Sequence, residues 1–212
     1  MFITRISRTR FAAAALLFCP VLGACTSAYT GPVEVTRFVA ENPLGLGSGM
    51  IVLEFPEEMS SANAQAAFAT AVGAELERLG YTLSDGAAAV SQTATIRTQR
   101  TAIEGSGSDS PVTVGGGAST GTFGSGVGLG VGINLGGGRN GPEITSQLEV
   151  RIRAADGETL WEGRAQLPTS IKSPYSELDA SARTLAAALF QDFPGGNGET
   201  VQVSVDEIER TP

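Results

Sequence analysis

Apolar and polar residues alternate along several stretches of this chain, a pattern typical of half-buried β-strands. The stretches that predict strands are residues 33–38, 50–55 (a continuous apolar run, typical of a core strand), 81–83, 90–98, 144–154, 159–167 and 201–205. The second stretch runs into Pro56, which cannot donate a backbone hydrogen bond and therefore ends the strand. Asp156-Gly157 separates two long stretches and is a hairpin signal, so we expect those two strands to pair antiparallel.

Two other stretches repeat apolar residues at spacings of three or four, which is the period of an amphipathic helix. The first apolar stripe consists of Ala64, Phe68, Val72, Leu76 and Leu79. Ser60 or Ser61 can cap the start of this helix with its side-chain oxygen, and Gly80 ends it. The first helix is therefore predicted between residues 61 and 79.

The second apolar stripe consists of Leu178, Ala182, Leu185, Leu189 and Phe193. It follows Ser173-Pro174, where proline suits the first turn of a helix, and it stops at residues 194–196. Strands and helices in this order predict an α+β fold, with a mainly antiparallel sheet and two helices on one face. We expect a single domain over residues 33–205 and a frayed, charged tail at 206–212.

The first 24 residues have the organisation of an export signal. Its parts, in order, are Arg5, Arg8 and Arg10, an apolar run at residues 11–22, and the motif Leu22-Gly23-Ala24-Cys25. This motif resembles the lipobox of bacterial lipoproteins, in which the cysteine thiol receives a diacylglyceryl group before cleavage. The resemblance implies cleavage after Ala24 and lipidation of Cys25. The residues that follow are small and polar and close with Gly31-Pro32, which predicts a short flexible tether at residues 25–32.

Ordinary secretory cleavage at the same bond is the alternative. It puts Leu22 where a small residue is expected, and it leaves an unpaired thiol at Cys25 in an oxidising compartment. An uncleaved anchor is not expected, because the apolar run of about 12 residues is shorter than the roughly 20 that a membrane-spanning helix needs.

The charge of the mature chain restricts its partners. Removal of residues 1–24 leaves 188 residues with 11 basic and 22 acidic side chains, a net charge near −11. A protein this acidic has no electrostatic reason to bind nucleic acid or anionic headgroups. We therefore expect acyl chains, and not surface charge, to hold it on a membrane.

The chain also lacks most of the side chains that catalysis and metal binding use. It contains no histidine, and its two cysteines are Cys19, inside the predicted signal, and Cys25. We therefore predict no metal, no cofactor and no enzymatic activity. A hydrolase using a serine with Lys172, or the neighbouring carboxylates Glu57 and Glu58, is the alternative, although adjacent residues rarely converge on one substrate.

Charged residues alternate with apolar ones in the two long strands joined by the hairpin. These charged residues are Glu149, Arg151, Arg153, Glu162 and Arg164. The alternation predicts ion pairs between strands on the solvent-facing side of the sheet. An anion site formed by the arginines is the alternative.

A glycine-rich insert, which we place at residues 105–141, interrupts the domain. Residues 115–141 contain 13 glycines among 27 residues. Within them, apolar side chains alternate with glycine or asparagine, at Val127, Leu129, Val131, Ile133 and Leu135. The alternation favours an extended hairpin with one apolar and one bare face, and the apolar residues are the predicted partner-binding site.

Other interpretations of the insert remain open. Glycines at 124, 128, 132 and 136 fit a membrane glycine zipper, but a period of two produces that spacing automatically, and each interior glycine costs a helix about 1 kcal/mol. A phosphate-binding loop at residues 136–141 needs a helix after it, whereas Pro142 and a strand follow. A passive loop is the remaining alternative.

Four segments carry glycine and aromatic landmarks, namely residues 33–38, 124–138, 161–163 (Trp-Glu-Gly) and 189–195 (Leu-Phe-Gln-Asp-Phe-Pro-Gly). With these segments, most of residues 33–205 resembles the domain-of-unknown-function 4136 family of bacterial lipoproteins. The resemblance implies a periplasm-facing α+β lipoprotein. The family has no established activity, so it supplies no catalytic residue.

The sequence thus predicts a lipid-anchored protein of the bacterial cell envelope that binds another envelope component through the insert. No acidic residue follows Cys25, so by resemblance to enterobacterial sorting we expect the outer membrane. An accessory subunit of a lipid- or solute-transport assembly is the alternative, and it would need a groove beside the insert.

Overall fold

The computed structural model describes residues 28–57, 59, 61–86, 91–103, 112–116, 129–133 and 143–210. The strands are β1 Val33–Val39, β2 Gly49–Glu54, β3 Tyr81–Ser84, β4 Gln92–Ile103, β5 Val112–Gly116, β6 Leu129–Ile133, β7 Glu143–Ala154, β8 Thr159–Ser170 and β9 Thr200–Val203. The helices are α1 Ala62–Leu79, the 3-10 turn η1 Pro174–Ser176, α2 Leu178–Phe190 and α3 Val205–Arg210.

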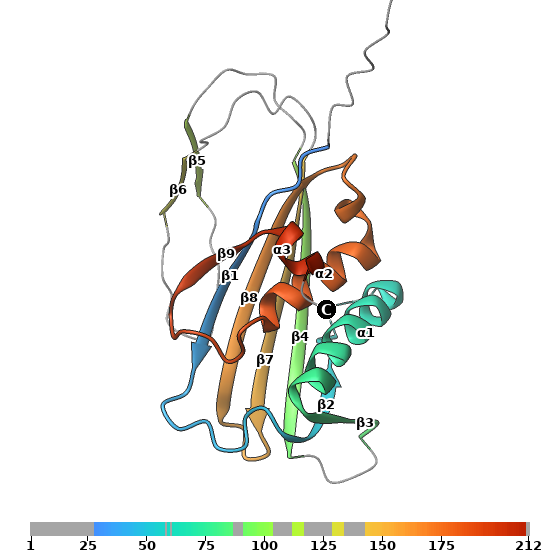
Figure 1. Ribbon diagram of the computed structural model, residues 1–212, viewed down its shortest axis with the longest axis vertical. Coiled ribbons are helices and arrows are strands. Elements are labelled where there is room, and N and C mark those ends of the chain that lie inside the picture. The colour runs from blue at the N-terminus through green and yellow to red at the C-terminus, as the bar shows by residue number, and fades with distance from the viewer. Residues whose placement is uncertain are drawn as a thin grey trace, which may run out of the picture.

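Seven of the strands form one mixed sheet, in the order β3-β2-β4-β7-β8-β1-β9 (Figure 1). Strand β2 runs parallel to both of its neighbours, β3 and β4, whereas the other neighbouring pairs are antiparallel. The α+β class is confirmed, but a mainly antiparallel sheet is only partly right. The chain passes through α1 between β2 and β3, and a crossover of this kind returns the next strand in the same direction.

Helix α1 begins and ends where the sequence places it. The Ser61 hydroxyl accepts a hydrogen bond from the Ala64 backbone nitrogen at 3.3 Å, and Gly80 ends the helix with a φ of 108°. Glycine adopts this left-handed conformation without steric cost. The helix buries Phe68, Val72 and Leu76 of the predicted stripe.

Helix α2 begins later than predicted. Pro174 lies in η1, whose first turn is capped by the Ser173 hydroxyl, and α2 itself starts at Leu178. Leu185 and Leu189 are fully buried, as the stripe predicts. Phe193 lies beyond the end of the helix but still packs against the core.

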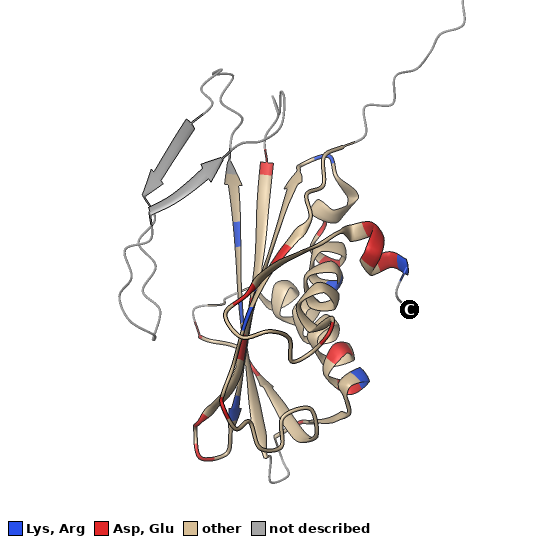
Figure 2. Cartoon of the chain, turned by 60° about the vertical axis from the view of Figure 1, so that its left-hand side comes forward, with Lys and Arg blue, Asp and Glu red and all other residues tan. Residues whose placement is uncertain are grey.

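The C-terminal segment is helical where a frayed tail was predicted. Residues 205–210 form α3, and the Ser204 hydroxyl accepts a hydrogen bond from the Glu207 nitrogen at 3.2 Å. Acidic residues in the first turn and Arg210 in the last complement the helix dipole. Figure 2 shows the acidic colour along this short helix beside the C-terminus. Val205 is buried and Ile208 packs against the core, so tertiary contacts hold this short helix in place.

The segment before β1 is also held on the fold. The Tyr29 carbonyl accepts from the Ser170 nitrogen, the Gly31 nitrogen donates to the Pro168 carbonyl, and Thr30 forms a β-bridge with Thr169. The flexible tether predicted at 25–32 is therefore wrong from Tyr29 onward, because these residues pair with the end of β8.

The core combines buried side chains of the seven-stranded sheet with those of α1 and α2. Leu148, Val150 and Ile152 of β7 are fully buried and belong to the core. The charged residues that alternate with them point to the opposite face of the sheet. Helix α1 packs beside α2, and α2 contacts β1, β7 and β8 (Figure 1).

Candidate binding site

The sequence-predicted lipidation site and part of the predicted partner-binding site lie outside the described residues. They are Leu22, Gly23, Ala24, Cys25, Val127 and Leu135. Leu129, Val131 and Ile133 belong to β6, which pairs antiparallel with β5 in a separate two-stranded sheet. Part of the insert thus has the extended backbone that its alternation predicts.

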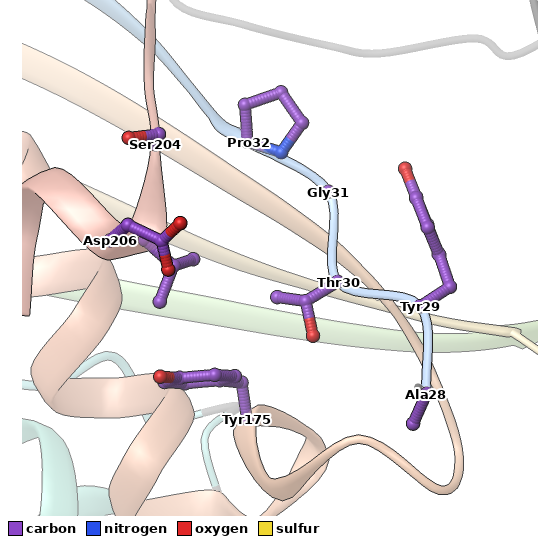
Figure 3. Close-up of a pocket in the computed structure, with 9 residues that line it drawn as sticks. Ala28, Tyr29, Thr30, Gly31, Pro32, Tyr175, Ser204 and Asp206 are labelled. Atoms are coloured by element: carbon purple, nitrogen blue, oxygen red, sulfur yellow. The ribbon is translucent and has the colours of Figure 1, made fainter. Parts of the chain in front are cut away.

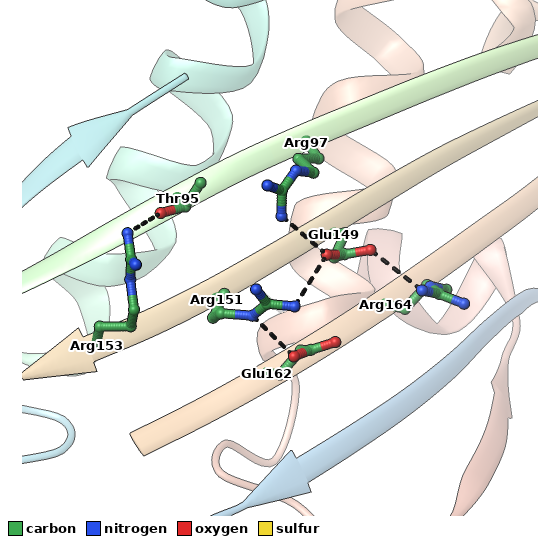
Figure 4. Close-up of polar contacts among 7 residues, drawn as sticks. All are labelled: Thr95, Arg97, Glu149, Arg151, Arg153, Glu162 and Arg164. Atoms are coloured by element: carbon green, nitrogen blue, oxygen red, sulfur yellow. Dashed lines mark hydrogen bonds and ion pairs between the residues drawn. The ribbon is translucent and has the colours of Figure 1, made fainter. Parts of the chain in front are cut away.

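The predicted ion pairs between strands are confirmed on the face of the sheet opposite the core (Figure 4). Glu149 of β7 contacts three arginines. Its carboxylate lies 3.2 Å from Arg164 Nη2, 3.6 Å from Arg97 Nη1 and 3.7 Å from Arg151 Nη2. Arg151 Nε also donates to Glu162 Oε2 at 2.9 Å, so the charges compensate one another across β4, β7 and β8.

Arg153 has different partners from those predicted. Its guanidinium donates to the Thr95 hydroxyl at 3.2 Å (Figure 4). It also lies 4.0 Å from Oε2 of Glu54, the last residue of β2. Because the arginines of this face already contact carboxylates or a hydroxyl, the arrangement favours surface ion pairing over an anion site. Pairs with an exposed member, such as Arg97–Glu149 and Arg153–Glu54, stabilise a fold by about 0–1 kcal/mol each.

A cavity of about 500 Å³ opens where the N-terminal segment joins the domain (Figure 3). Three segments line this cavity: residues 28–32, Tyr175 of η1, and residues 204–206 around the start of α3. It exposes hydroxyl groups and the Asp206 carboxylate, which suit hydrogen bonding to a polar ligand. Three segments that are far apart in the sequence therefore come together around this cavity.

Tyr175 forms a side-chain hydrogen bond that connects two elements beside this cavity. Its hydroxyl donates to the Glu209 carboxylate of α3 and so links η1 to α3. The hydrogen bond to Glu209 raises the pKa of the Tyr175 phenol, with further contributions from burial and from the charges of Glu209 and Asp206. The phenol therefore stays protonated and acts as a hydrogen-bond donor at neutral pH.

Tyr175 also lines a second cavity, of about 440 Å³, between α1, α2 and α3. The walls are mostly small side chains, among them Ala71, Ala74, Ala180 and Ala187. Glu75 and Arg183 also border it. This cavity is less polar in its lining than the first.

Three of the four landmark segments meet in one buried cluster. Arg37 of β1 donates from Nε to the Leu189 carbonyl at 2.9 Å, and from Nη2 to the carbonyls of Ala188 at 2.9 Å and Gln191 at 2.8 Å. Only 6% of Arg37 is exposed, and burial lowers the pKa of its guanidinium, partly offset by the nearby Asp192 carboxylate. Arg37 thus caps the C-terminal end of α2, where the helix dipole favours a cation.

Aromatic rings complete this cluster. The Trp161 ring stacks on Phe190 with centroids 5.4 Å apart and contacts Phe193 at 5.2 Å, while its Nε1 donates to the Pro194 carbonyl at 2.9 Å. A Cβ on Gly163 would lie 2.3 Å from the Trp161 ring, so this position requires glycine. The landmarks 33–38, 161–163 and 189–195 are therefore packing features that fix α2 to the sheet.

Sequence reasoning missed the buried role of Arg37, because an arginine in an alternating strand usually faces solvent. The signal was present, since Arg37 stands two residues after Val35 and four after Val33, on the face that both valines bury.

The residues of the hydrolase alternative are not brought together. The Ser173 hydroxyl lies 2.6 Å from the Thr30 hydroxyl and accepts from the Tyr175 nitrogen, while Lys172 and Glu57 are exposed. Glu58 lies outside the described residues. Among the residues that the structure describes, no three histidine, cysteine, aspartate or glutamate side chains are grouped to hold a metal ion.

No helix within the described ranges has the length and apolar character needed to cross a bilayer.

No protein-family model and no curated protein matches this chain. Similar solved structures include a PDZ domain protein from Parabacteroides distasonis, with 16% identity and a TM-score of 0.47. The alignment covers 83% of this chain, which spans 38% of that protein's length. The PelC dodecamer from Paraburkholderia phytofirmans is similar in two crystal forms, with 13% identity and TM-scores of 0.37 and 0.38. Those alignments cover 74% of this chain and 92% or 93% of PelC.

Proposed function

We propose that this chain is a lipid-anchored protein of the bacterial cell envelope that faces the periplasm and acts by binding another envelope component. The observation that carries the proposal is Cys25, which directly follows Leu22-Gly23-Ala24 behind a basic and apolar segment. Acylation of this cysteine would attach the domain to a membrane a few residues before the fold begins at Tyr29. The anchor would be acyl chains, consistent with the strongly acidic balance of the remaining chain.

The resemblance to the domain-of-unknown-function 4136 lipoproteins supports the same assignment. Three segments of that resemblance contact one another through Arg37, Trp161 and Leu189, as a shared packing motif would. We infer that these landmark segments reflect the fold of the family and carry no catalytic chemistry.

We further propose that α1 and α2 together cover one face of the sheet. The contacts of α2 with β1, β7 and β8, and of α1 with α2, support this arrangement. The opposite face, with the Glu149 ion pairs, is then available to solvent or to a partner. The partner-binding element proposed from the sequence is the insert, through Val127, Leu129, Val131, Ile133 and Leu135.

Metabolic labelling with a radioactive or alkyne fatty acid tests the anchor. We expect label on the wild-type protein and none on Cys25→Ala, which should accumulate as a soluble or unprocessed form. Cys19→Ala is the matched control and should keep the label, because Cys19 lies inside the predicted signal. Label that persists on Cys25→Ala would end the lipoprotein assignment.

Separation of inner and outer membranes tests the destination of the anchored protein. Thr26 and Ser27 follow the cysteine, so we expect the intact protein in the outer-membrane fraction. Recovery in the inner membrane would refute this part of the proposal while leaving the anchor in place.

A further inference from the structure

Four points of the chain meet at one end of the seven-stranded sheet. The last residue of β4, Ile103, pairs with the first residue of β7, Glu143, and Glu143 in turn pairs with Ser170 at the end of β8. The Ser170 nitrogen donates to the Tyr29 carbonyl at 2.9 Å. The segment that leads to the predicted anchor and both ends of the glycine-rich insert therefore join the fold in one row (Figure 1).

The chain between Cys25 and Tyr29 is short. An extended chain gains at most about 3.6 Å per residue, so four residues reach about 14 Å. Tyr29 is held in place on the sheet. Its carbonyl accepts a hydrogen bond from Ser170, and the neighbouring residues Thr30 and Gly31 pair with Thr169 and Pro168. A cysteine whose acyl chains lie in a bilayer therefore holds this end of the sheet within about 14 Å of the headgroups.

The turn after β8 lies at this end and has the side chains that suit a bilayer surface. Ile171 is 48% exposed, one of the few large apolar side chains on the described surface with that much exposure. Lys172 is the single lysine of the chain, is exposed, and has no hydrogen bond or ion pair to any residue that the structure describes. An apolar side chain beside a free ammonium can enter the interface while the ammonium stays with the phosphates.

The turn is also fixed in position. The Ser173 nitrogen donates to the Ser170 carbonyl at 3.0 Å, and the Ser173 hydroxyl lies 2.6 Å from that of Thr30. These contacts tie residues 170–173 to Tyr29 and Thr30, in the segment that leads to the proposed anchor. Ile171 and Lys172 therefore keep a fixed position relative to that segment.

We propose that the end of the sheet formed by Tyr29, Ile103, Glu143 and Ser170 lies against the lipid bilayer, with Ile171 and Lys172 at the lipid surface. This inference rests on the proposed lipid anchor and adds an orientation to it. The opposite end, with the β7–β8 turn at residues 155–158, points away from the membrane. The insert begins and ends on the membrane side, so it starts from the lipid surface and not from the far end of the domain.

The orientation can be measured with a fluorescent label on a single introduced cysteine in the full-length, lipidated protein. The test variants are Ile171→Cys and Lys172→Cys, and the matched control is Ala155→Cys, an exposed small residue at the opposite end. Strand β7 has 12 residues, which separate the two ends by about 40 Å. The proteins are placed in phosphatidylethanolamine–phosphatidylglycerol vesicles that carry a nitroxide quencher on the headgroup.

We expect headgroup nitroxides to remove roughly half or more of the fluorescence at positions 171 and 172 and none at position 155, because quenching does not reach across about 40 Å. Equal quenching at both ends, or quenching at 155 alone, would overturn the orientation. The mass of the N-terminal peptide is measured on the same samples. An acylated Cys25 without quenching at 171 and 172 rejects the orientation alone, whereas an unmodified Cys25 rejects both the anchor and the inference that rests on it.

Discussion

At the scale of single residues, Arg37 is the side chain on which the attachment of α2 depends most. Its guanidinium replaces the missing donors at the end of the helix, because three carbonyls there accept from it. The carbon stem of the same side chain fills space beside Gly195, where an added Cβ would lie 2.6 Å from Arg37 Cδ. One residue therefore combines packing with hydrogen bonding.

Arg37→Met should lower the free energy of unfolding by about 2–4 kcal/mol, since methionine keeps the apolar stem but leaves buried carbonyls without a donor. Urea unfolding at 25 °C checks this value. Arg97→Met is the matched control, and it should cost at most about 1 kcal/mol because the Arg97 side chain is 50% exposed. Equal costs for the two variants would show that the Arg37 hydrogen bonds contribute nothing.

Leu189 tests the apolar stripe of α2 in the same way. It is fully buried and lies next to Gly163, so Leu189→Ala should cost about 2–5 kcal/mol through lost contacts and a residual cavity. Leu44 is 76% exposed, and Leu44→Ala should change the free energy of unfolding by no more than about 0.5 kcal/mol. A Leu189→Ala protein that melts like the wild type would show that this helix face is misassigned.

At the scale of elements, local patterns predicted the strands and the two long helices well. The stripe from Ala64 to Leu79 and the alternation in β7 depend on neighbouring residues, which the sequence displays directly. Pairing between strands depends on residues far apart, so the parallel neighbours of β2 were not predicted. Helix α3 was missed because its charged sequence has little apolar content of its own, and its stability comes from Val205 and Ile208 on the core.

The insert connects the ends of two strands that are paired directly with each other. Strands β4 and β7 pair along their full lengths up to Ile103 and Glu143, and β5 and β6 form their own sheet. Replacement of residues 104–142 by Asn-Gly would join two directly paired residues through a two-residue turn, a favoured hairpin connection. We therefore expect the midpoint of thermal unfolding to change by only a few degrees.

The same shortened protein separates a binding role from a passive one. A photocrosslinking probe at Leu129 of the full-length protein should capture an envelope component in living cells. The shortened protein, which carries its probe at another site, should not crosslink to that component. Failure of the shortened protein to fold would make the insert part of the core. Capture of the same partner without the insert would make it a passive loop.

At the scale of the whole molecule, the sequence predicted the class of fold but not how the parts of the candidate sites come together. The cavity beside Tyr175 combines residues 28–32 with residues 204–206, and no local pattern connects segments so far apart. The pairing of Tyr29 with Ser170 was missed for the same reason, since short polar residues after a signal are typical of a tether. That pairing is the basis of the orientation that we propose relative to the lipid anchor.

We propose that the mature chain begins at an acylated Cys25. The most direct test is mass spectrometry of the N-terminal peptide from protein extracted from bacterial membranes with detergent. We expect a peptide that starts at Cys25 and carries a diacylglyceryl group, with or without a further acyl chain on its amine. A peptide that starts at Cys25 with an unmodified thiol, or one that still contains residues 1–24, would contradict lipidation at Cys25.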